Sequence, residues 1–187
     1  PLLLLEFHGS EASVNEQAEM FASIAEEYTD FEFKWTSDEA ARKKLWKARH
    51  DAYYASLAYA PGKVGVSTDV CVPISRLAEC VEETRKDIEE CGILSGIVGH
   101  VGDGNFHCLP MCDPEDKEMR AVIDGFISRL SERAIAMGGT CTGEHGIGQG
   151  KQNYIRKEHG DAVDVMMMIK STLDPKGIMN PGKVLKE

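Results

Sequence analysis

The chain has 187 residues, which is enough for one domain with a buried core. Its composition, 42% hydrophobic and 28% charged, is typical of a globular protein. The net charge of −10 argues against a nucleic-acid partner, because a phosphate-binding surface needs clustered lysine and arginine.

In the first third of the chain, apolar stretches are separated by residues that typically cap helices. We expect two strands and two helices there. They are a strand at residues 2–7, a helix from a cap at Asn15 to about Tyr28, a half-buried strand at residues 31–35, and a helix from Ser37 to Tyr59. The Pro61-Gly62 pair would end the last of these helices.

The rest of the chain has helical and β-branched stretches of ordinary length. They predict a strand at residues 64–72, a helix from Pro73 or Ser75 to near Cys91, a hairpin at residues 93–111, a helix from Asp113 to Met137, and a mostly helical tail at residues 151–173. Strands and helices alternate, but the hairpin breaks the pattern. We therefore expect one α+β domain over residues 1–187, with a largely antiparallel sheet, helices packed on one face and a ferredoxin-like topology.

The hairpin contains 100-HVGDGNFH-107, with a histidine on each side of a flexible tip. Asp103-Gly104 reads as a two-residue turn, which would place His100 directly opposite His107. Opposed residues share a face of the sheet, with Cβ atoms ~5 Å apart. Two imidazoles at that spacing can bind one metal ion at ~2 Å each.

A second dense stretch, 138-GGTCTGEHGIGQGK-151, is rich in glycine and carries the adjacent pair Glu144-His145. It lacks the spacing of a phosphate-binding P-loop, and no dinucleotide-binding fingerprint occurs in the chain. Glu144 could complete a set of two histidines and a carboxylate, which suits Zn, Mn or Fe(II). His145 would then be left to move a proton.

The six cysteines are scattered and form no CxxC pair. This spacing predicts reduced thiols in an intracellular protein. Cys108 and Cys112 lie near the two histidines in the sequence and are an alternative set of ligands.

Several segments together resemble one family. HVGDGNFH, GGTCTGEHGIGQGK and DPKGIMNPGKVL, with LWKARHDAYYASLA and STDVCVP before them, resemble the C-terminal half of FAD-linked D-2-hydroxyacid dehydrogenases. The resemblance is strongest to the cytochrome-type D-lactate dehydrogenase group. It implies a flavoprotein of the vanillyl-alcohol-oxidase type, in which this chain is the C-terminal cap that binds substrate. The N-terminal FAD-binding domain would be absent from this chain, which alone would be inactive.

The resemblance also implies roles for particular residues. His100, His107 and Glu144 would be the metal ligands, and His145 the base that takes the proton of the substrate hydroxyl. Asn105 would contact the substrate, and Arg49 would bind its carboxylate. The hydroxyglutarate branch of the family has a substrate-binding lysine where this chain reads 66-VSTDV-70, so the resemblance favours a short monocarboxylate such as D-lactate.

The same resemblance implies the cofactors and partners. These are FAD, bound mainly by the missing domain, a divalent metal (Zn, Mn or Fe), and an electron acceptor such as a cytochrome, a quinone or an electron-transfer flavoprotein. A homodimer is a further candidate assembly. The expected compartment is the mitochondrion or the bacterial cytoplasm, with peripheral attachment to the membrane as an option.

Two other functions fit the same residues. A metal-dependent hydrolase could use the two histidines and Glu144 to activate water, and it would act on esters or amides without a second domain. A non-catalytic ferredoxin-like binding module would use its histidines only for structure, and added Zn or Mn would not change its stability.

Overall fold

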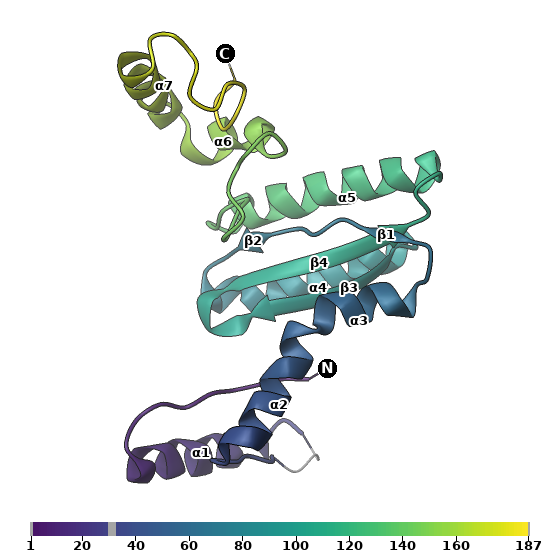
Figure 1. Cartoon of the computed structure of the whole chain (residues 1–187), viewed down its shortest axis with the longest axis vertical. Helices are drawn as coiled ribbons and strands as arrows, with labels where there is room; N and C mark the ends of the chain where they lie inside the picture. Colours follow the sequence, from purple (N-terminus) through teal and green to yellow (C-terminus); the bar gives the residue numbers. More distant parts are fainter. Residues whose placement is uncertain (1, 30–32, 187) are drawn as a thin grey trace. The chain divides into compact units, whose positions relative to one another are not determined.

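The structure is a computed structural model that describes residues 2–29 and 33–186. The chain divides into two compact units, Pro1–Ala55 and Ser56–Glu187, and each is described by itself (Figure 1). Within the described residues, no helix is both long enough and apolar enough to cross a membrane.

The first unit contains α1 (Glu11–Ala25), α2 (Glu39–His50) and the start of α3 (Ala52–Tyr59). Helix α1 begins earlier than the predicted cap at Asn15. Ser10 has an extended backbone, and its hydroxyl accepts a hydrogen bond from the Ser13 amide at 3.3 Å. That hydrogen bond caps the first turn and makes Ser10 the N-cap.

The prediction of two strands in this unit is wrong for the residues that the structure describes. Residues 2–7 and 33–35 lie in irregular structure, and residues 31–32 are outside the described part of the chain. An apolar run becomes a strand only where a neighbour pairs with its backbone. Here Phe7 and Phe33 instead contact Phe21 of α1, with ring centroids 6.3 and 5.0 Å from it.

The predicted helix from Ser37 to Tyr59 is confirmed, apart from its start and one interruption. Asp38 caps α2 by accepting from the Ala41 amide at 2.8 Å. At Asp51 the helix is interrupted, although the Ala55 amide still donates to the Asp51 carbonyl at 2.8 Å. A helical hydrogen bond therefore still links the end of α2 to α3.

The second unit is built on an antiparallel sheet with β4 (Asn105–Cys112) at its centre. Strand β3 (Leu94–His100) pairs with β4 along its whole length. On the other side lie β1 (Val64–Gly65) and β2 (Val70–Cys71), which pair with β4 in one register. Between them, the amides of Val66 and Thr68 still donate to β4 carbonyls, at 3.0 and 2.9 Å. Residues 64–71 thus form one edge, as the predicted strand required.

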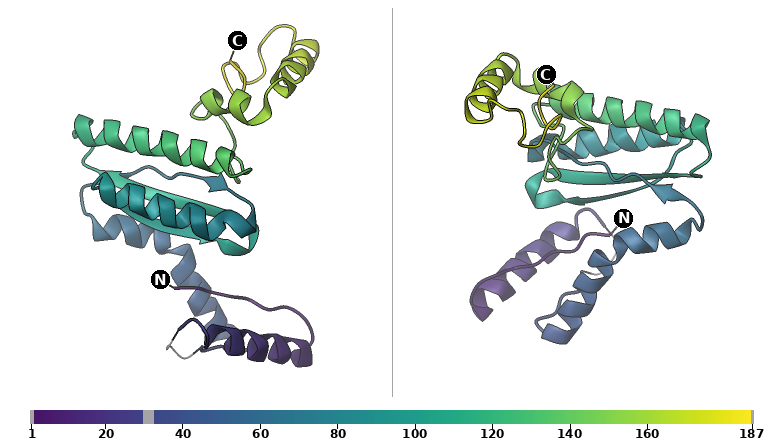
Figure 2. Two further views of the ribbon diagram at one scale, coloured as in Figure 1. Left: turned by 180° about the vertical axis from the view of Figure 1, so that it is seen from behind. Right: turned by 45° about the horizontal axis from the view of Figure 1, so that its top comes forward.

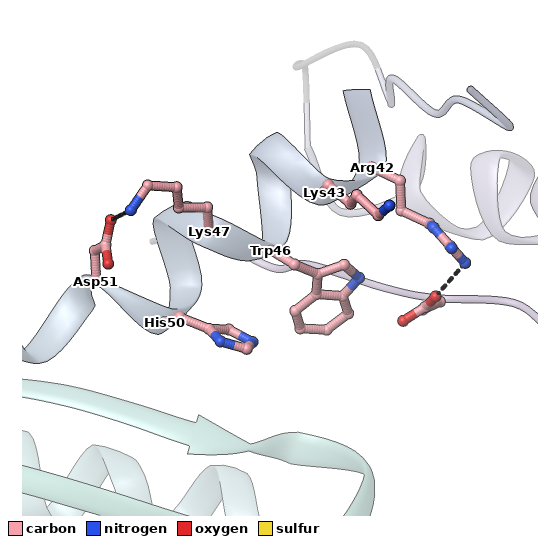
Figure 3. Close-up of a pocket in the computed structure, with 7 residues that line it drawn as sticks. Arg42, Lys43, Trp46, Lys47, His50 and Asp51 are labelled. Carbon is pink, nitrogen blue, oxygen red and sulfur yellow. Dashed lines mark hydrogen bonds and ion pairs between the residues drawn. The ribbon is translucent and has the colours of Figure 1, made fainter. Parts of the chain in front are cut away.

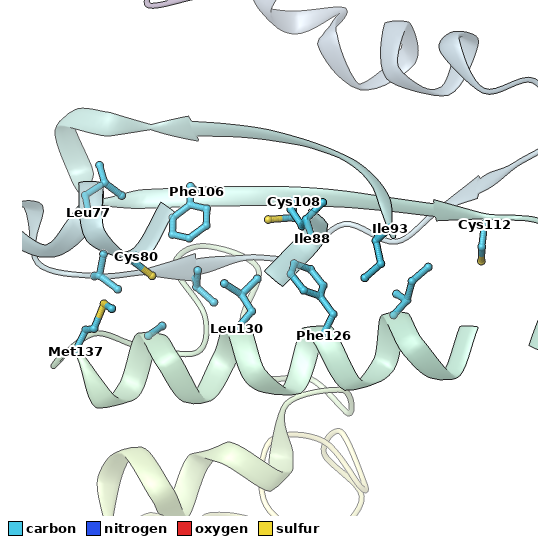
Figure 4. Close-up of a cluster of buried hydrophobic side chains, with 14 residues drawn as sticks. Leu77, Cys80, Ile88, Ile93, Phe106, Cys108, Cys112, Phe126, Leu130 and Met137 are labelled. Carbon is cyan, nitrogen blue, oxygen red and sulfur yellow. The ribbon is translucent and has the colours of Figure 1, made fainter. Parts of the chain in front are cut away.

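Helices α4 (Ile74–Glu90) and α5 (Lys117–Ala136) cover one face of this sheet (Figure 2). Their apolar residues meet those of β4 in the main core (Figure 4). The buried residues of this core are Val70, Val72, Leu77, Cys80, Ile88, Ile93, Phe106, Cys108, Cys112, Ile123, Phe126, Leu130, Ala134 and Met137. The α+β class with an antiparallel sheet is confirmed.

On the opposite face of the sheet, residues of the second unit form a smaller core. Leu57 and Ala60, from the end of α3 and just after it, pack on Leu109 and Met111 of β4. After α5, Thr140 forms an isolated antiparallel bridge with Cys71. The ferredoxin-like topology stays a prediction.

The turn of the hairpin differs from the prediction. Residues Val101–Asp103 form a short 3-10 turn, and Gly104 follows with φ 74°. His100 therefore pairs with Asn105, and His107 pairs with Val98. The Gly104 carbonyl accepts from the Val72 amide at 3.0 Å, and a Cβ on Gly104 would lie 2.1 Å from the Val72 carbonyl oxygen. The loop between His100 and Asn105 has four residues, 101–104, where the prediction had a two-residue turn.

The tail is helical, as predicted, and consists of α6 (Gln152–His159) and α7 (Ala162–Leu173). All six cysteines are free. Cys108 and Cys112 are buried in the main core, so the alternative that made them metal ligands is wrong. Burial raises the pKa of the Cys108 thiol to about 12, which also removes it as a ready ligand.

We predict that Phe126→Ala lowers the free energy of unfolding by about 3–5 kcal/mol, because a fully buried aromatic ring would leave a cavity. Denaturant unfolding measures the change. Val122→Ala on the same helix is the control, since Val122 is exposed and its loss should cost under about 1 kcal/mol. An equal loss of unfolding free energy in both variants would contradict the burial of Phe126 in the main core.

Candidate functional site

The structure brings together the three residues predicted as metal ligands. Their ligand atoms, one from each of His100, His107 and Glu144, all lie within 4.8 Å of one another. His100 ends β3, His107 is in β4, and Glu144 is in the glycine-rich loop that follows α5. Two strands of one hairpin and a loop much later in the sequence therefore meet at one point.

The two histidines share a face of the sheet in spite of the changed register. They are diagonal neighbours, with ring centroids 6.1 Å apart and ring planes at 87°. A slip of two residues leaves a side chain on its original face, because the period of a strand is two. The two histidines therefore lie close together, as predicted, although the predicted turn was wrong.

His107 has a close polar contact at each ring nitrogen. Its Nδ1 is 3.0 Å from the Thr68 carbonyl oxygen, and its Nε2 is 2.9 Å from Glu144 Oε1. The carbonyl can only accept, so Nδ1 carries a proton. Nε2 is then the nitrogen that faces Glu144, either as a donor or, without a proton, as a ligand.

The Thr68 carbonyl is available to His107 because the sheet is irregular at this residue. In a regular antiparallel pair it would accept from the Cys108 amide. Here that amide donates to the Thr68 hydroxyl instead, at 2.7 Å. The Thr68 hydroxyl therefore accepts the hydrogen bond of the Cys108 amide, and the Thr68 carbonyl oxygen is left to accept from His107.

Asp69 is the site residue that the sequence analysis missed. Its side chain is buried, and Oδ2 accepts hydrogen bonds from Thr142 Oγ1 and from the amides of Glu144 and His145, each at 2.9 Å. Burial alone would raise the pKa of Asp69, but these hydrogen bonds and the Lys151 ammonium outweigh it and hold the pKa below its usual value. An acidic residue inside the β-branched stretch at residues 64–72 was the feature that could have indicated it.

Gly143 allows the loop to approach the sheet closely. A Cβ on this residue would lie 2.4 Å from Asn105 Oδ1 and 2.9 Å from Asp69 Oδ1. Real Cβ atoms do not come so close to a polar oxygen, so only glycine fits without a shift of the loop. Both oxygens are buried and have no hydrogen-bond partner in the described part of the chain.

His145 lies at the exposed side of the cluster. Its ring stacks on that of His107, with centroids 5.3 Å apart and planes at 17°. Nε2 of His145 is 3.9 Å from Glu144 Oε1, and about half of the side chain is exposed (49%). The imidazole is thus next to the cluster and accessible to a molecule bound there.

The two residues predicted to bind substrate, Asn105 and Arg49, lie in different units of the chain. Asn105 lies on β4 on the same face as His107 but is buried, with 7% of its surface exposed. Arg49 lies on α2, in the first unit. Both roles stay predictions.

A hollow of about 510 Å³ lies in the first unit (Figure 3), and none of the predicted site residues lines it. Its cations are already paired. Arg42 contacts Glu6 at 2.9 Å, and Lys47 contacts Asp51 at 2.6 Å. The hollow therefore offers an anion little free positive charge.

Comparison with known proteins agrees with the motifs. The family model described as FAD linked oxidases, C-terminal domain, matches residues 1–184. The chain belongs to this family. This FAD-linked oxidase chain is 51% identical over 187 residues to the probable mitochondrial D-lactate dehydrogenase of Danio rerio, covering 100% of this chain and 38% of the relative. It is 42% identical over 186 residues to the mitochondrial D-lactate dehydrogenase [cytochrome] of Arabidopsis thaliana, covering 99% and 33%.

The FAD-linked oxidase chain thus spans less than half the length of these relatives. Among solved structures, 4-ethylphenol oxidase from Gulosibacter chungangensis matches with a TM-score of 0.63 and 21% identity. The match covers 95% of this chain and 37% of that one. At that identity the likeness shows a shared fold.

We predict that Gly143→Ala destabilises the protein by about 1–3 kcal/mol, because the new methyl group would overlap Asn105 and Asp69. Thermal unfolding measures this loss. Gly150→Ala is the matched control in the same loop, since a Cβ there meets nothing within 4 Å. If the two variants were equally stable, the close packing of the loop would be wrong.

Proposed function

We propose that this chain is the substrate- and metal-binding part of an FAD-dependent oxidoreductase that oxidises a D-2-hydroxyacid, with D-lactate favoured, to the 2-oxoacid. The observation that carries the proposal is the convergence of His100, His107 and Glu144, with His145 stacked beside them. The names of the relatives support the reaction, because D-lactate dehydrogenases from several organisms match nearly the whole chain.

The cluster fits a divalent cation. Two imidazoles and one carboxylate are the donors that Zn, Mn and Fe(II) accept, and such a set leaves positions open for substrate. The Thr68 carbonyl already orients Nδ1 of His107 away, which leaves Nε2 for the cation. When bound, the metal would supply Lewis acidity that lowers the pKa of a substrate hydroxyl.

His145 is the proposed base for the hydroxyl proton. Its ring lies against His107 and is accessible, and a neutral imidazole accepts protons near neutral pH. FAD would supply the acceptor for the hydride that leaves the substrate carbon, a role that no side chain can perform.

The proposed substrate is a short monocarboxylate. Residues 66–70 contain no lysine that could bind a second carboxylate. Thr68 and Asp69 of this segment are instead used to hold His107 and the loop. Arg49 would bind the one carboxylate through its two-donor guanidinium, and Asn105 would contact the substrate.

The remaining partners belong to the same proposal. The FAD domain would lie in a part of the protein outside this single C-terminal domain, and electrons would pass on to a cytochrome, a quinone or an electron-transfer flavoprotein. We propose the mitochondrion as the compartment, because the relatives from Danio rerio and Arabidopsis thaliana are named as mitochondrial proteins. A homodimer is proposed as the assembly.

The test of this function is reduction of the flavin by substrate. The full-length protein is expected to show a flavin absorption spectrum that D-lactate bleaches faster than L-lactate, D-2-hydroxyglutarate or glycolate. Absence of bleaching by every D-2-hydroxyacid, together with chelator-sensitive hydrolysis of esters or amides, would replace this function with the hydrolase.

We predict that His107→Ala weakens binding of Mn²⁺ or Zn²⁺ by more than about 100-fold, since even residues that only support a ligand contribute 10–100-fold. Calorimetric titration of the 187-residue chain measures the affinity. His159→Ala, on the exposed end of α6, is the control and should bind as the unaltered chain does. Unchanged affinity in the His107 variant would remove the cluster as a metal site.

We predict that His145→Ala slows flavin reduction by about 10²- to 10⁴-fold, the usual contribution of a positioned general base. Stopped-flow absorbance gives the rate, and elemental analysis gives the metal content, which should stay nearly the same. His159→Ala should leave both unchanged. Loss of metal without loss of rate would show that the roles of Glu144 and His145 are exchanged.

A further inference from the structure

We propose that Asp69 is a positioning residue that sets the conformation of the glycine-rich loop, so that Glu144 and His145 face the two histidines. This inference rests on the proposed function for what Glu144 and His145 do. It assigns to Asp69 a role that no motif of the sequence indicated.

The loop has no helix or strand at this point. Glycines occupy positions 143, 146 and 148, and glycine restricts the backbone less than any other residue. Residues 141–151 belong to no helix or strand. The regular hydrogen bonds of a helix or strand therefore do not fix the directions of the Glu144 and His145 side chains.

Asp69 supplies those contacts at a single oxygen. Oδ2 accepts the Thr142 hydroxyl and two successive backbone amides, those of Glu144 and His145. Hydrogen bonds to a carboxylate are stronger than those to a neutral oxygen. Holding both amides restrains the backbone at Glu144 and His145 and hence the directions in which both side chains leave it.

Asp69 also holds the far end of the loop. Lys151 Nζ donates to the Asp69 carbonyl at 2.6 Å and lies 3.7 Å from Oδ2. The one residue thus binds the loop near its start, through Thr142, and at its end, through Lys151. Because the Asp69 side chain is fully buried, water cannot replace these contacts without a movement of the loop.

The geometry at the cluster follows from this arrangement. With its backbone held, Glu144 reaches His107 Nε2 at 2.9 Å, and the His145 ring stacks on the His107 ring. Asp69 itself is next to His107, with Oδ1 3.8 Å from Nδ1, but the Thr68 carbonyl is the nearer partner. The effect of Asp69 on the cluster therefore passes through the loop.

The test is Asp69→Asn, which keeps the shape and removes the charge. Asp174→Asn is the matched control, because Asp174 is also buried, accepts two backbone amides, from Ile178 and Met179, and pairs with Lys170. In the 187-residue chain we measure Mn²⁺ affinity by calorimetry, amide exchange of Glu144 and His145 by NMR, and thermal unfolding. A purely structural role would make the two variants alike in all three.

Asp69→Asn is expected to weaken Mn²⁺ binding by about 10- to 100-fold and to speed exchange of the two amides, while Asp174→Asn changes neither. A change in only one of these two readouts, or in neither, would overturn the inference. If the unaltered chain binds no Mn²⁺, the metal part of the proposed function fails. The amides then decide alone: faster exchange in Asp69→Asn but not in Asp174→Asn supports the inference, and equal exchange overturns it.

Discussion

The antiparallel pairing of β4 with both of its neighbours is the constraint on which the second unit depends. Side chains alternate along this strand, so Phe106 and Cys108 enter the main core while Asn105 and His107 lie on the other face. A shift of one residue would put the histidine into the core and the phenylalanine into the site. The main core and the candidate site are thus maintained by the same register.

The strand edge formed by residues 64–71 contributes to both the main core and the candidate site, and its pairing with β4 is irregular. Pro110 has no amide hydrogen, and the Cys108 amide bonds to a threonine hydroxyl, so the ladder lacks two of its usual bonds. The Thr68 carbonyl that the Cys108 amide leaves free is not lost, because it accepts from His107. The departure from a regular sheet is therefore what orients the imidazole.

The buried carboxylate of Asp69 shows how the site is held without a rigid loop. A charged group inside a protein is costly unless it is paired and hydrogen-bonded. At Oδ2, three donors and a nearby ammonium meet that need, and all of them come from the glycine-rich loop or its end. Docking of the loop therefore brings the donors that stabilise the charge.

Local patterns in the sequence determined the helices at residues 74–90 and 117–136 within a few positions, because capping and helical periodicity depend on near neighbours. They also placed His100 and His107 on one face, since a register error of two residues does not change the face. The strand predicted at residues 2–7 failed, because an apolar run does not reveal whether a partner strand exists. Only the tertiary structure showed that Asp69 holds Glu144, 75 residues further along the chain, and that Thr68 orients His107. Contacts between residues so distant leave no periodic pattern, and they form only when the strands have paired and the loop has folded back on the sheet.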